Sequence, residues 1–265
     1  MTDLDLAVLR AAAEAAARAG GEVILESFDT PPNVREKSQG DWVTDADMES
    51  ERTVRRVLAD LAPGIPVHGE EEGGDRDAAL HWLVDPLDGT ANFVHGHPAV
   101  GCSVGLVADG RPVVGVVHAP MLHQTYSAAL GAGATRNGVP LSVSDRSLSR
   151  GIIATGFPFR RKDLSAAYLA AFGRVHAAAE DLRRCGAASL DLCWTAAGVF
   201  DGYFELGLGS WDVAAGGLIV REAGGTVTDW FGDDADWLRS GDIVAAAPQV
   251  HGPLRDTIGE TRSTR

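Results

Sequence analysis

The sequence predicts an α/β protein made of two closely packed lobes, and three observations lead to this fold class. The chain opens with an Ala-rich stretch, 3–28, in which apolar residues recur at helical spacing. The rest of the first half contains short apolar runs separated by turn signals, as in an antiparallel sheet. The second half alternates strand-like and helix-like segments, which is typical of a layered α/β arrangement with a largely parallel or mixed sheet. The polar stretch "SVSDRSLSR" places the boundary near residue 145, so the predicted lobes are 1–145 and 146–265.

The first lobe should contain two helices and an antiparallel meander. After the first helix, Pro31–Pro32 marks a loop or short strand, and a second helix should run from Thr44 to about Leu61. Thr44 and Asp47 resemble a capping box, in which each side chain bonds the backbone amide of the other residue. Asp109–Gly110 lies between two alternating β-rich runs and indicates a hairpin. The remaining strands of this lobe are expected at "IPVHGEE", "HWLVDP" and "QTYSAAL".

The second lobe alternates elements along its whole length. A strand at "GIIATG" precedes a helix over about 163–180, and a short strand and turn follow at "DLRRCGA". A helix at "ASLDLCWTAAG", a strand at "DGYFEL" and a helix at "WDVAAGGLIVREAGG" come next. The segments "TVTDW" and "DIVAAAP" supply the last predicted strands.

The composition is that of an ordinary soluble globular protein, with 45% apolar and 23% charged residues in 265. No stretch approaches the length of uncharged apolar residues that a membrane-spanning helix needs. The first ten residues carry acids where a secretory signal carries bases, so we expect a cytoplasmic protein. Three cysteines form no CxxC pair, which fits reduced thiols used for packing: Cys102, Cys185 and Cys193.

The net charge of −14 argues against nucleic acid or an anionic membrane as a partner. Much of this charge is concentrated, because the segment from Asp41 to Asp88 holds thirteen acids and four bases. Such a segment is either a solvated acidic surface or a cation site.

Five acids stand out by their context. Asp85 and Asp88 follow the apolar run "HWLV" three residues apart, Glu70 follows "IPVHG", Asp47 lies in the first turn of the second helix, and Asp212 lies where "GSWDVAAGG" enters a helix. Each has an ordinary explanation as a turn residue, a surface acid or a helix cap.

At the ends of apolar strands, however, these acids would face the crevice of a sheet. Two carboxylates about 4 Å apart repel by about 4 kcal/mol at an effective dielectric near 20, so a buried cluster must hold protons or a cation. Oxygen ligands without histidines or thiolates favour Mg²⁺, Mn²⁺ or Ca²⁺ over zinc.

Four motifs together resemble the inositol monophosphatase family, which belongs to the lithium-sensitive, magnesium-dependent phosphatase superfamily. "DWVTDAD", "GEE", "WLVDPLDGTANFVHG" and "WDVAAG…EAGG" occur in the order and approximate separations of that family, from about Lys37 onward. The resemblance implies a layered α-β-α-β-α sandwich of the sugar-phosphatase type. It also implies a homodimer, with most metal ligands in the first lobe and substrate contacts in the second.

The resemblance implies two or three Mg²⁺ ions, with Mn²⁺ as an alternative. Glu70, Asp85 and the backbone carbonyl of Leu87 match the ligands of the first ion. Asp85, Asp88 and Asp212 match those of the second, and Glu70 would also touch a third.

The catalytic set that the resemblance implies is Asp47, Thr90 and Glu70. Asp47 and Thr90 match the pair that orients and helps deprotonate an attacking water, so hydrolysis would proceed in line without a phosphoenzyme. The backbone N–H groups of Gly89 and Thr90 match the segment that meets the phosphate.

The favoured reaction is hydrolysis of inositol 1-phosphate to inositol and phosphate. Glu205 matches a position that contacts an inositol hydroxyl, Asp212 would also touch the substrate, and the loop beside the ligand matches Gly186, Ala187 and Ala188. Ala187 departs from the Ser or Thr often found there, so one hydroxyl contact is absent.

Other substrates and another class of function remain open. Histidinol phosphate could present an ammonium group to Glu205. Fructose 1,6-bisphosphate or 3′-phosphoadenosine 5′-phosphate could place a second phosphate on the bases of 159–162 or 183–184, although a basic surface run is the commoner explanation. A non-catalytic metal- or phosphate-binding regulatory protein would predict damage at Thr90, Asp47 or a metal ligand, and all of these are present.

Overall fold

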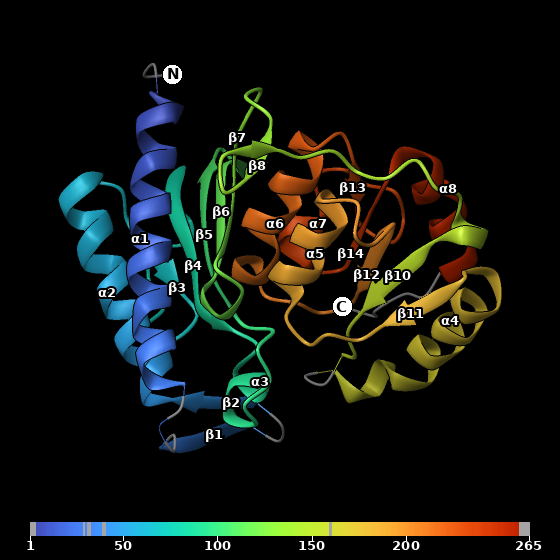
Figure 1. Ribbon diagram of the computed structural model, residues 1–265, viewed down its shortest axis with the longest axis horizontal. Helices are drawn as coiled ribbons and strands as arrows, with labels where there is room; N and C mark the ends of the chain where they lie inside the picture. Colours follow the sequence, from blue (N-terminus) through green and yellow to red (C-terminus); the bar gives the residue numbers. More distant parts are fainter. Residues whose placement is uncertain (1–3, 29, 31–32, 39–40, 159–160, 260–265) are drawn as a thin grey trace.

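The computed structural model describes residues 4–28, 30, 33–38, 41–158 and 161–259 and stacks them in five alternating layers (Figure 1). Helices α1 and α2 cover the outer face of a seven-stranded sheet, α5 and α6 lie between this sheet and a five-stranded sheet, and α4 and α8 cover the far side. The predicted α-β-α-β-α order is therefore confirmed. The helices are α1 (Leu6–Ser27), α2 (Asp45–Leu61), α3 (Thr90–Val94), α4 (Ser165–Ala178), α5 (Ala188–Ala196), α6 (Ser210–Glu222), α7 (Trp237–Ser240) and α8 (Pro248–Ile258).

The seven-stranded sheet follows the chain order, β3 to β9. Only β3 and β4 run parallel, and the other neighbours form the predicted antiparallel meander. Asp109 and Gly110 join β5 to β6 with positive φ angles of 49° and 75°, as a tight hairpin turn requires. The strands are β3 (Val67–Gly69), β4 (Leu80–Asp88), β5 (Gly101–Ala108), β6 (Arg111–Ala119), β7 (Gln124–Ala129), β8 (Ala134–Arg136) and β9 (Val139–Pro140).

The five-stranded sheet is mixed, as expected, with the order β11-β10-β12-β14-β13. Strand β10 runs parallel to β11 and β12, whereas β14 is antiparallel to β12 and β13. Its strands are β10 (Ile152–Thr155), β11 (Asp181–Arg183), β12 (Gly202–Glu205), β13 (Thr226–Thr228) and β14 (Ile243–Ala246). Each sheet lies on one side of residue 145, and the division into lobes at that position remains a proposal.

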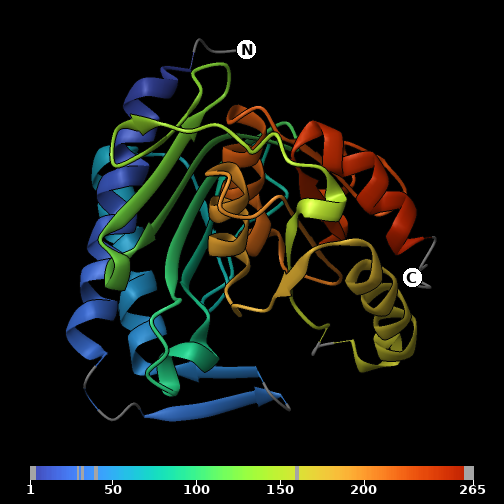
Figure 2. The ribbon, with the colours of Figure 1, turned by 45° about the vertical axis from the view of Figure 1, so that its right-hand side comes forward.

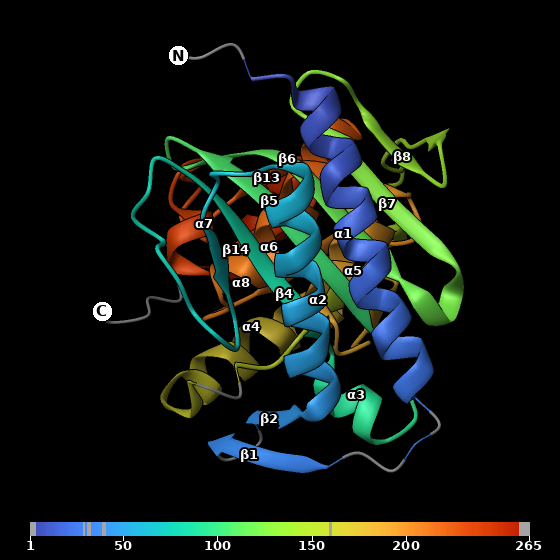
Figure 3. The ribbon, with the colours of Figure 1, turned by 90° about the vertical axis from the view of Figure 1, so that its left-hand side faces the viewer.

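Helices pack against both faces of the seven-stranded sheet through small residues. Figure 3 shows α1 and α2 lying across the outer face, where α1 presents buried alanines and glycines to the sheet. On the inner face α6 approaches β6 so closely that a Cβ on Gly115 would lie 2.6 Å from the carbonyl oxygen of Ala215. This contact brings the first turn of α6, and with it Asp212, close to the end of β4.

The predicted elements are present, β1 lies in the segment expected as a loop or short strand, and one further strand and three helices were not predicted. A small hairpin of β1 (Val34–Ser38) and β2 (Asp41–Thr44) projects next to α3 at one end of the molecule (Figure 2). Helices α3, α7 and α8 were not predicted, the last because Pro253 inside it is typical of a helix breaker. Pro31–Pro32 lies outside the described residues. Within the described part of the chain, every helix is too short or too polar to cross a membrane.

Candidate active site

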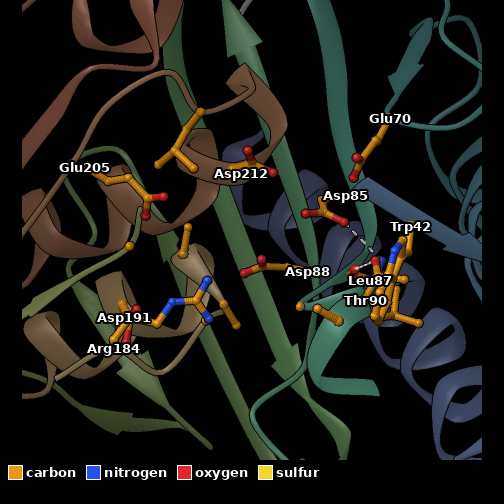
Figure 4. A pocket seen from close by; sticks show the side chains of 17 residues that line it. Trp42, Glu70, Asp85, Leu87, Asp88, Thr90, Arg184, Asp191, Glu205 and Asp212 are labelled. Carbon is orange, nitrogen blue, oxygen red and sulfur yellow. Dashed lines mark hydrogen bonds between the residues drawn. The ribbon is translucent and has the colours of Figure 1, made fainter. Parts of the chain in front are cut away.

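A pocket of about 200 Å³ opens where β4 ends, beside the N-terminal turns of α5 and α6 (Figure 4). Residues far apart in the chain meet in its wall, and they include almost the whole predicted site. Asp47 is the exception, since it lies behind the wall in contact with Thr90. The predicted residues in the wall are Glu70, Asp85, Leu87, Asp88, Gly89, Thr90, Gly186, Ala187, Ala188, Glu205 and Asp212.

The two aspartates of β4 reach the same pocket because the strand carries one extra residue between them. Asp85 pairs with Ser103 of β5, and Asp88 pairs with Gly101. Three steps along β4 therefore match two steps along β5, which is the geometry of a β-bulge. Residues three apart in a regular strand face opposite sides of the sheet, and the bulge cancels this alternation.

Three carboxylates converge most closely, and with Asp88 we call them the acid wall. One oxygen from each of Glu70, Asp85 and Asp212 lies within 4.8 Å of the other two. Asp212 is the third residue of α6, and its Oδ2 also accepts the backbone N–H of Gly209 at 2.7 Å. Gly209, not Asp212, is therefore the N-cap of α6, and the carboxylate bonds the N-cap amide while it lies in the wall of the pocket.

The acid wall is electrostatically unfavourable without a cation. Burial raises the pKa of Asp85 well above its ordinary value, and the charges of Glu70, Asp88 and Asp212 raise it further. A cation among these oxygens would offset this unfavourable effect. The donor atoms are all carboxylate oxygens, which suits Mg²⁺ or Mn²⁺ rather than zinc.

Asp88 is held by the second half of the chain. Its Oδ2 accepts the backbone N–H of Ser189 at 2.7 Å and the Ser189 hydroxyl at 2.6 Å. Burial raises the pKa of Asp88 to about 6, although the Ser189 donors oppose the rise. Asp88 is not one of the three residues that converge within 4.8 Å, so its role as a ligand stays a prediction. Ser189 was not among the predicted site residues.

The turn that carries Glu70 is fixed from α2 by a buried ion pair. The carboxylate of Glu51 is fully buried, and it accepts the backbone N–H groups of Glu71 at 2.8 Å and Glu72 at 3.1 Å. Arg55 Nη2 lies 2.7 Å from Glu51 Oε1 and balances its charge. The position of Glu70 therefore depends on a carboxylate that lies outside the pocket.

A second basic residue approaches the same turn from β1. Lys37 Nζ lies 2.6 Å from Glu71 Oε1 and 3.4 Å from Glu70 Oε1. Burial raises the pKa of Glu71 to about 7, and the bond from Lys37 opposes this shift. The lysine thus contacts an acid of the predicted metal site.

Asp47 and Thr90 form a hydrogen-bonded pair at the edge of the pocket. The Thr90 hydroxyl donates to Asp47 Oδ1 at 3.0 Å and lies 3.1 Å from the carbonyl oxygen of Leu87. Asp47 Oδ2 accepts the backbone N–H of Thr44 at 2.8 Å and the Thr44 hydroxyl at 2.6 Å, which confirms the predicted capping box. Burial raises the pKa of Asp47, and these hydrogen bonds act against the rise.

Gly89 gives the chain room to turn from β4 into α3. Its φ of +89° lies in the left-handed region, which a side chain disfavours. A Cβ at this position would also lie 2.9 Å from the carbonyl oxygen of Ala99. The turn places Thr90 at the start of α3, with both residues in the pocket wall.

The other side of the pocket carries charges of both signs, and we call Arg184, Asp191 and Glu205 the mixed-charge wall (Figure 4). Burial raises the pKa of Glu205 to about 8, although the Tyr203 hydroxyl donates to this carboxyl. Burial also raises the pKa of Asp191 well above its ordinary value. Asp191 was missed as a site residue, but an acid inside the apolar helix "ASLDLCWTAAG" was a signal that could have found it.

The bases considered for a second phosphate are dispersed. Arg183 pairs with Asp181 at the surface, Arg161 pairs with Asp163, and Arg184 is the one base of the described residues in the pocket wall. Phe159 and Arg160 lie outside the described residues.

Comparisons with known proteins agree on one family. The family described as "Inositol monophosphatase family" matches residues 5–262. "Nus factor SuhB" of Pasteurella multocida is 41% identical over 240 residues, covering 89% of this chain and 90% of that protein. The crystal structure of extragenic suppressor protein suhB from Bartonella henselae has a TM-score of 0.90 at 34% identity, covering 97% of this chain and 100% of the other. Inositol monophosphatase from Anabaena (Nostoc) sp. PCC 7120 has a TM-score of 0.87 at 33% identity, covering 98% and 99%.

Proposed function

Because the chain belongs to the inositol monophosphatase family, we propose that it hydrolyses a small phosphate monoester with Mg²⁺, and that inositol 1-phosphate is the favoured substrate. The observation that carries the proposal is the convergence of three carboxylates within 4.8 Å in a pocket beside the Thr90–Asp47 pair. The first element suits divalent cations, and the second can accept a proton from water.

The residues that would hold the cations are those of the acid wall together with the carbonyl oxygen of Leu87. Mg²⁺ at such a site makes a bound water more acidic and stabilises charge on the phosphate and the leaving alkoxide. Mn²⁺ would serve the same ligands, and we propose inhibition by lithium on the basis of family membership. The protein's own contribution is to hold these oxygens in place through the bulge in β4 and the Glu51 contacts.

The Thr90–Asp47 pair would receive the proton of the attacking water. Thr90 already donates its hydroxyl proton to Asp47, so its oxygen is free to accept a hydrogen bond from water. Asp47 can take up the proton because burial raises its pKa toward the working range of a general base. Two bonds from Thr44 hold the carboxylate in the required orientation.

The remaining pocket residues would bind the ester. Backbone N–H groups at Gly89 and Thr90 would meet the phosphate, and Gly186, Ala187, Ala188, Glu205 and Asp212 would contact the group that leaves. We further propose a cytoplasmic homodimer, with neither nucleic acid nor membrane as a partner.

Phosphate release from a panel of esters tests the proposal. Wild type with Mg²⁺ should hydrolyse inositol 1-phosphate faster than histidinol phosphate, fructose 1,6-bisphosphate and 3′-phosphoadenosine 5′-phosphate. Asp85→Asn should lower the rate by more than about a thousandfold, since it removes an oxygen shared by the predicted ligand sets. Preference for another ester would change the proposed substrate but support metal-dependent hydrolysis. Absence of metal-dependent hydrolysis of every ester would contradict the proposal that the protein is a phosphatase.

A second candidate is a non-enzymatic regulatory function. It is favoured by the name of the Pasteurella multocida relative, "Nus factor SuhB", which does not describe an enzyme. The two functions separate in a strain that lacks this protein. Growth restored by Asp85→Asn as well as by wild type would support the regulatory function, and growth restored by wild type alone would support catalysis.

A further inference from the structure

Two aromatic rings connect the chain segments that carry Glu70 and Asp212. The ring centroids of His68 and Trp211 lie 5.6 Å apart at an interplanar angle of 47°, and we call these two residues the ring pair. His68 is the middle residue of β3, two positions before Glu70, and Trp211 directly precedes Asp212 in the first turn of α6. The ring pair therefore joins the two segments whose acids lie on either side of Asp85 in Figure 4.

The His68 ring belongs to the same hydrogen-bonded segment as Glu70. Its Nδ1 atom lies 2.9 Å from the carbonyl oxygen of Gly74, at the end of the turn that carries Glu70. The backbone between the ring and the acid follows β4, because Gly69 pairs with Val84 and the N–H of Glu70 donates to the carbonyl oxygen of Val84 at 3.0 Å. Glu70 is thus tied to the sheet, whereas Asp212 is carried by a helix that packs on the sheet.

The ring of Trp211 is held by packing. Its Nε1 atom is buried without a hydrogen-bond partner among the described residues, which is costly, so the ring occupies this place because of its shape. Gly209 leaves the space, since an added Cβ there would lie 2.5 Å from Cε2 of the indole. The carbonyl oxygen of Trp211 accepts the Ser103 hydroxyl at 3.2 Å, and Ser103 pairs with Asp85 across β5 and β4. Trp211 therefore contacts β5 through its backbone and β3 through its ring.

The ring pair can influence the site only through the acids beside it. The pocket wall contains Glu70 and Asp212, and neither ring is part of it. Carboxylates that converge within 4.8 Å repel one another, so without a cation the segments that carry them tend to separate. A ring contact between β3 and α6 opposes this separation.

We propose that His68 and Trp211 are positioning residues, which set the separation of Glu70 and Asp212 before a cation binds. The proposal rests on the proposed function, because Mg²⁺ is the cation whose binding it concerns. It adds to that function a contact between two side chains that touch neither the cation nor the ester.

The test measures Mg²⁺ affinity from the shift in melting temperature and, separately, kcat at saturating Mg²⁺. His68→Ala removes a half-buried ring and leaves every predicted ligand in place, so the melting temperature without Mg²⁺ should change little. Mg²⁺ affinity should fall about tenfold, as for residues that orient metal ligands. At saturating Mg²⁺ kcat should stay close to that of wild type, because the bound cation itself draws the carboxylates together.

Two further substitutions isolate the contact between the rings. His68→Phe keeps an aromatic ring beside Trp211 and should retain most of the Mg²⁺ affinity. Trp211→Leu removes the partner ring, so His68→Ala added to Trp211→Leu should cause no further loss of affinity, as expected of residues that act as a pair.

Phe172→Ala is the matched control. It deletes a tilted ring contact of 5.8 Å between α4 and Phe157, on the far side of the molecule from β3, and should leave Mg²⁺ affinity unchanged. Unchanged affinity in His68→Ala, or equal losses in His68→Ala and His68→Phe, would overturn the inference alone. Wild type whose melting temperature does not respond to Mg²⁺ and which releases no phosphate with Mg²⁺ would overturn the proposed function and the inference with it.

Discussion

The two walls of the pocket solve the problem of buried charge in different ways. Carboxyl groups of like charge gather in the acid wall, and protein groups outside the pocket hold several of them, as Ser189 holds Asp88 and Gly209 holds Asp212. The mixed-charge wall places two acids beside an arginine and leaves one buried carboxyl oxygen, Asp191 Oδ1, without a hydrogen-bond partner among the described residues. The difference teaches that the first wall has the chemistry to hold a cation, whereas the second offers charged groups of both signs to a bound molecule.

Among substitutions that leave the acid wall intact, the largest effect should follow removal of the proton acceptor. Asp47→Asn keeps the size of the side chain but can no longer take a proton through Thr90. We expect kcat to fall by about a hundredfold to ten-thousandfold. Mg²⁺ affinity, measured by the shift in melting temperature, should stay close to that of wild type. A large loss of Mg²⁺ affinity would show instead that Asp47 belongs to the acid wall.

A smaller effect should follow loss of the support behind Glu70. Glu51→Gln removes the charge that faces Arg55 and the two backbone amides, so the turn should loosen. We expect Mg²⁺ affinity to fall by about ten- to a hundredfold, as for residues that orient metal ligands.

Glu49→Gln provides the control for this variant, because Glu49 lies on the same helix with 60% of its side chain exposed. Titration of each protein with Mg²⁺, followed by melting temperature, measures the affinity. Equal affinities in the two variants would contradict the positioning role of Glu51.

The smallest expected effect is a pH dependence of the melting temperature that comes from the mixed-charge wall and not from the acid wall. Burial raises the pKa of Glu205 from 4.5 to about 8 on folding, so its contribution to stability is complete below pH 4.5 and is lost as the pH rises through 8. If the acid wall binds Mg²⁺ as proposed, saturating Mg²⁺ should offset its charge and leave Glu205 to titrate. The melting temperature should therefore still fall by several degrees between pH 6 and pH 9 in Mg²⁺.

Glu205→Gln should reduce this remaining decline, because the group no longer ionises. Melting curves of wild type and Glu205→Gln across the same pH range make the comparison. A decline that is the same in both proteins would assign it to groups outside the mixed-charge wall.

The acid wall was predictable from sequence to a greater degree than the mixed-charge wall. Asp85 and Asp88 lie in one short segment that carries its own turn, so their proximity is local, whereas Glu70 and Asp212 come from other segments and were assigned through the resemblance of their motifs. Arg184 and Asp191 flank a loop that only the packing of α5 brings to the pocket. The path of Arg184 over Gly186 depends on a side-chain conformation, which residue type and spacing do not determine.

Most of the secondary structure was predictable because local sequence signals determine it. The prediction failed where those signals are too short or conflict with one another. The capping box at Thr44 and Asp47 marks the start of α2 correctly. Helix α3 has five residues and follows a glycine in the left-handed region, so no periodic pattern can develop. In α8 the packing of Leu254 and Ile258 in the core outweighs the preference of Pro253.

The bulge in β4 makes the length of one segment matter more than the identity of its residues. Leu87 contributes a carbonyl near the pocket while its side chain is buried in the core, so another apolar residue could replace it. Deleting or inserting one residue between Asp85 and Asp88 would instead change the parity of the strand and send one carboxylate to the opposite face of the sheet. The residues at this turn can therefore be exchanged for others, but the number of residues between Asp85 and Asp88 must stay the same.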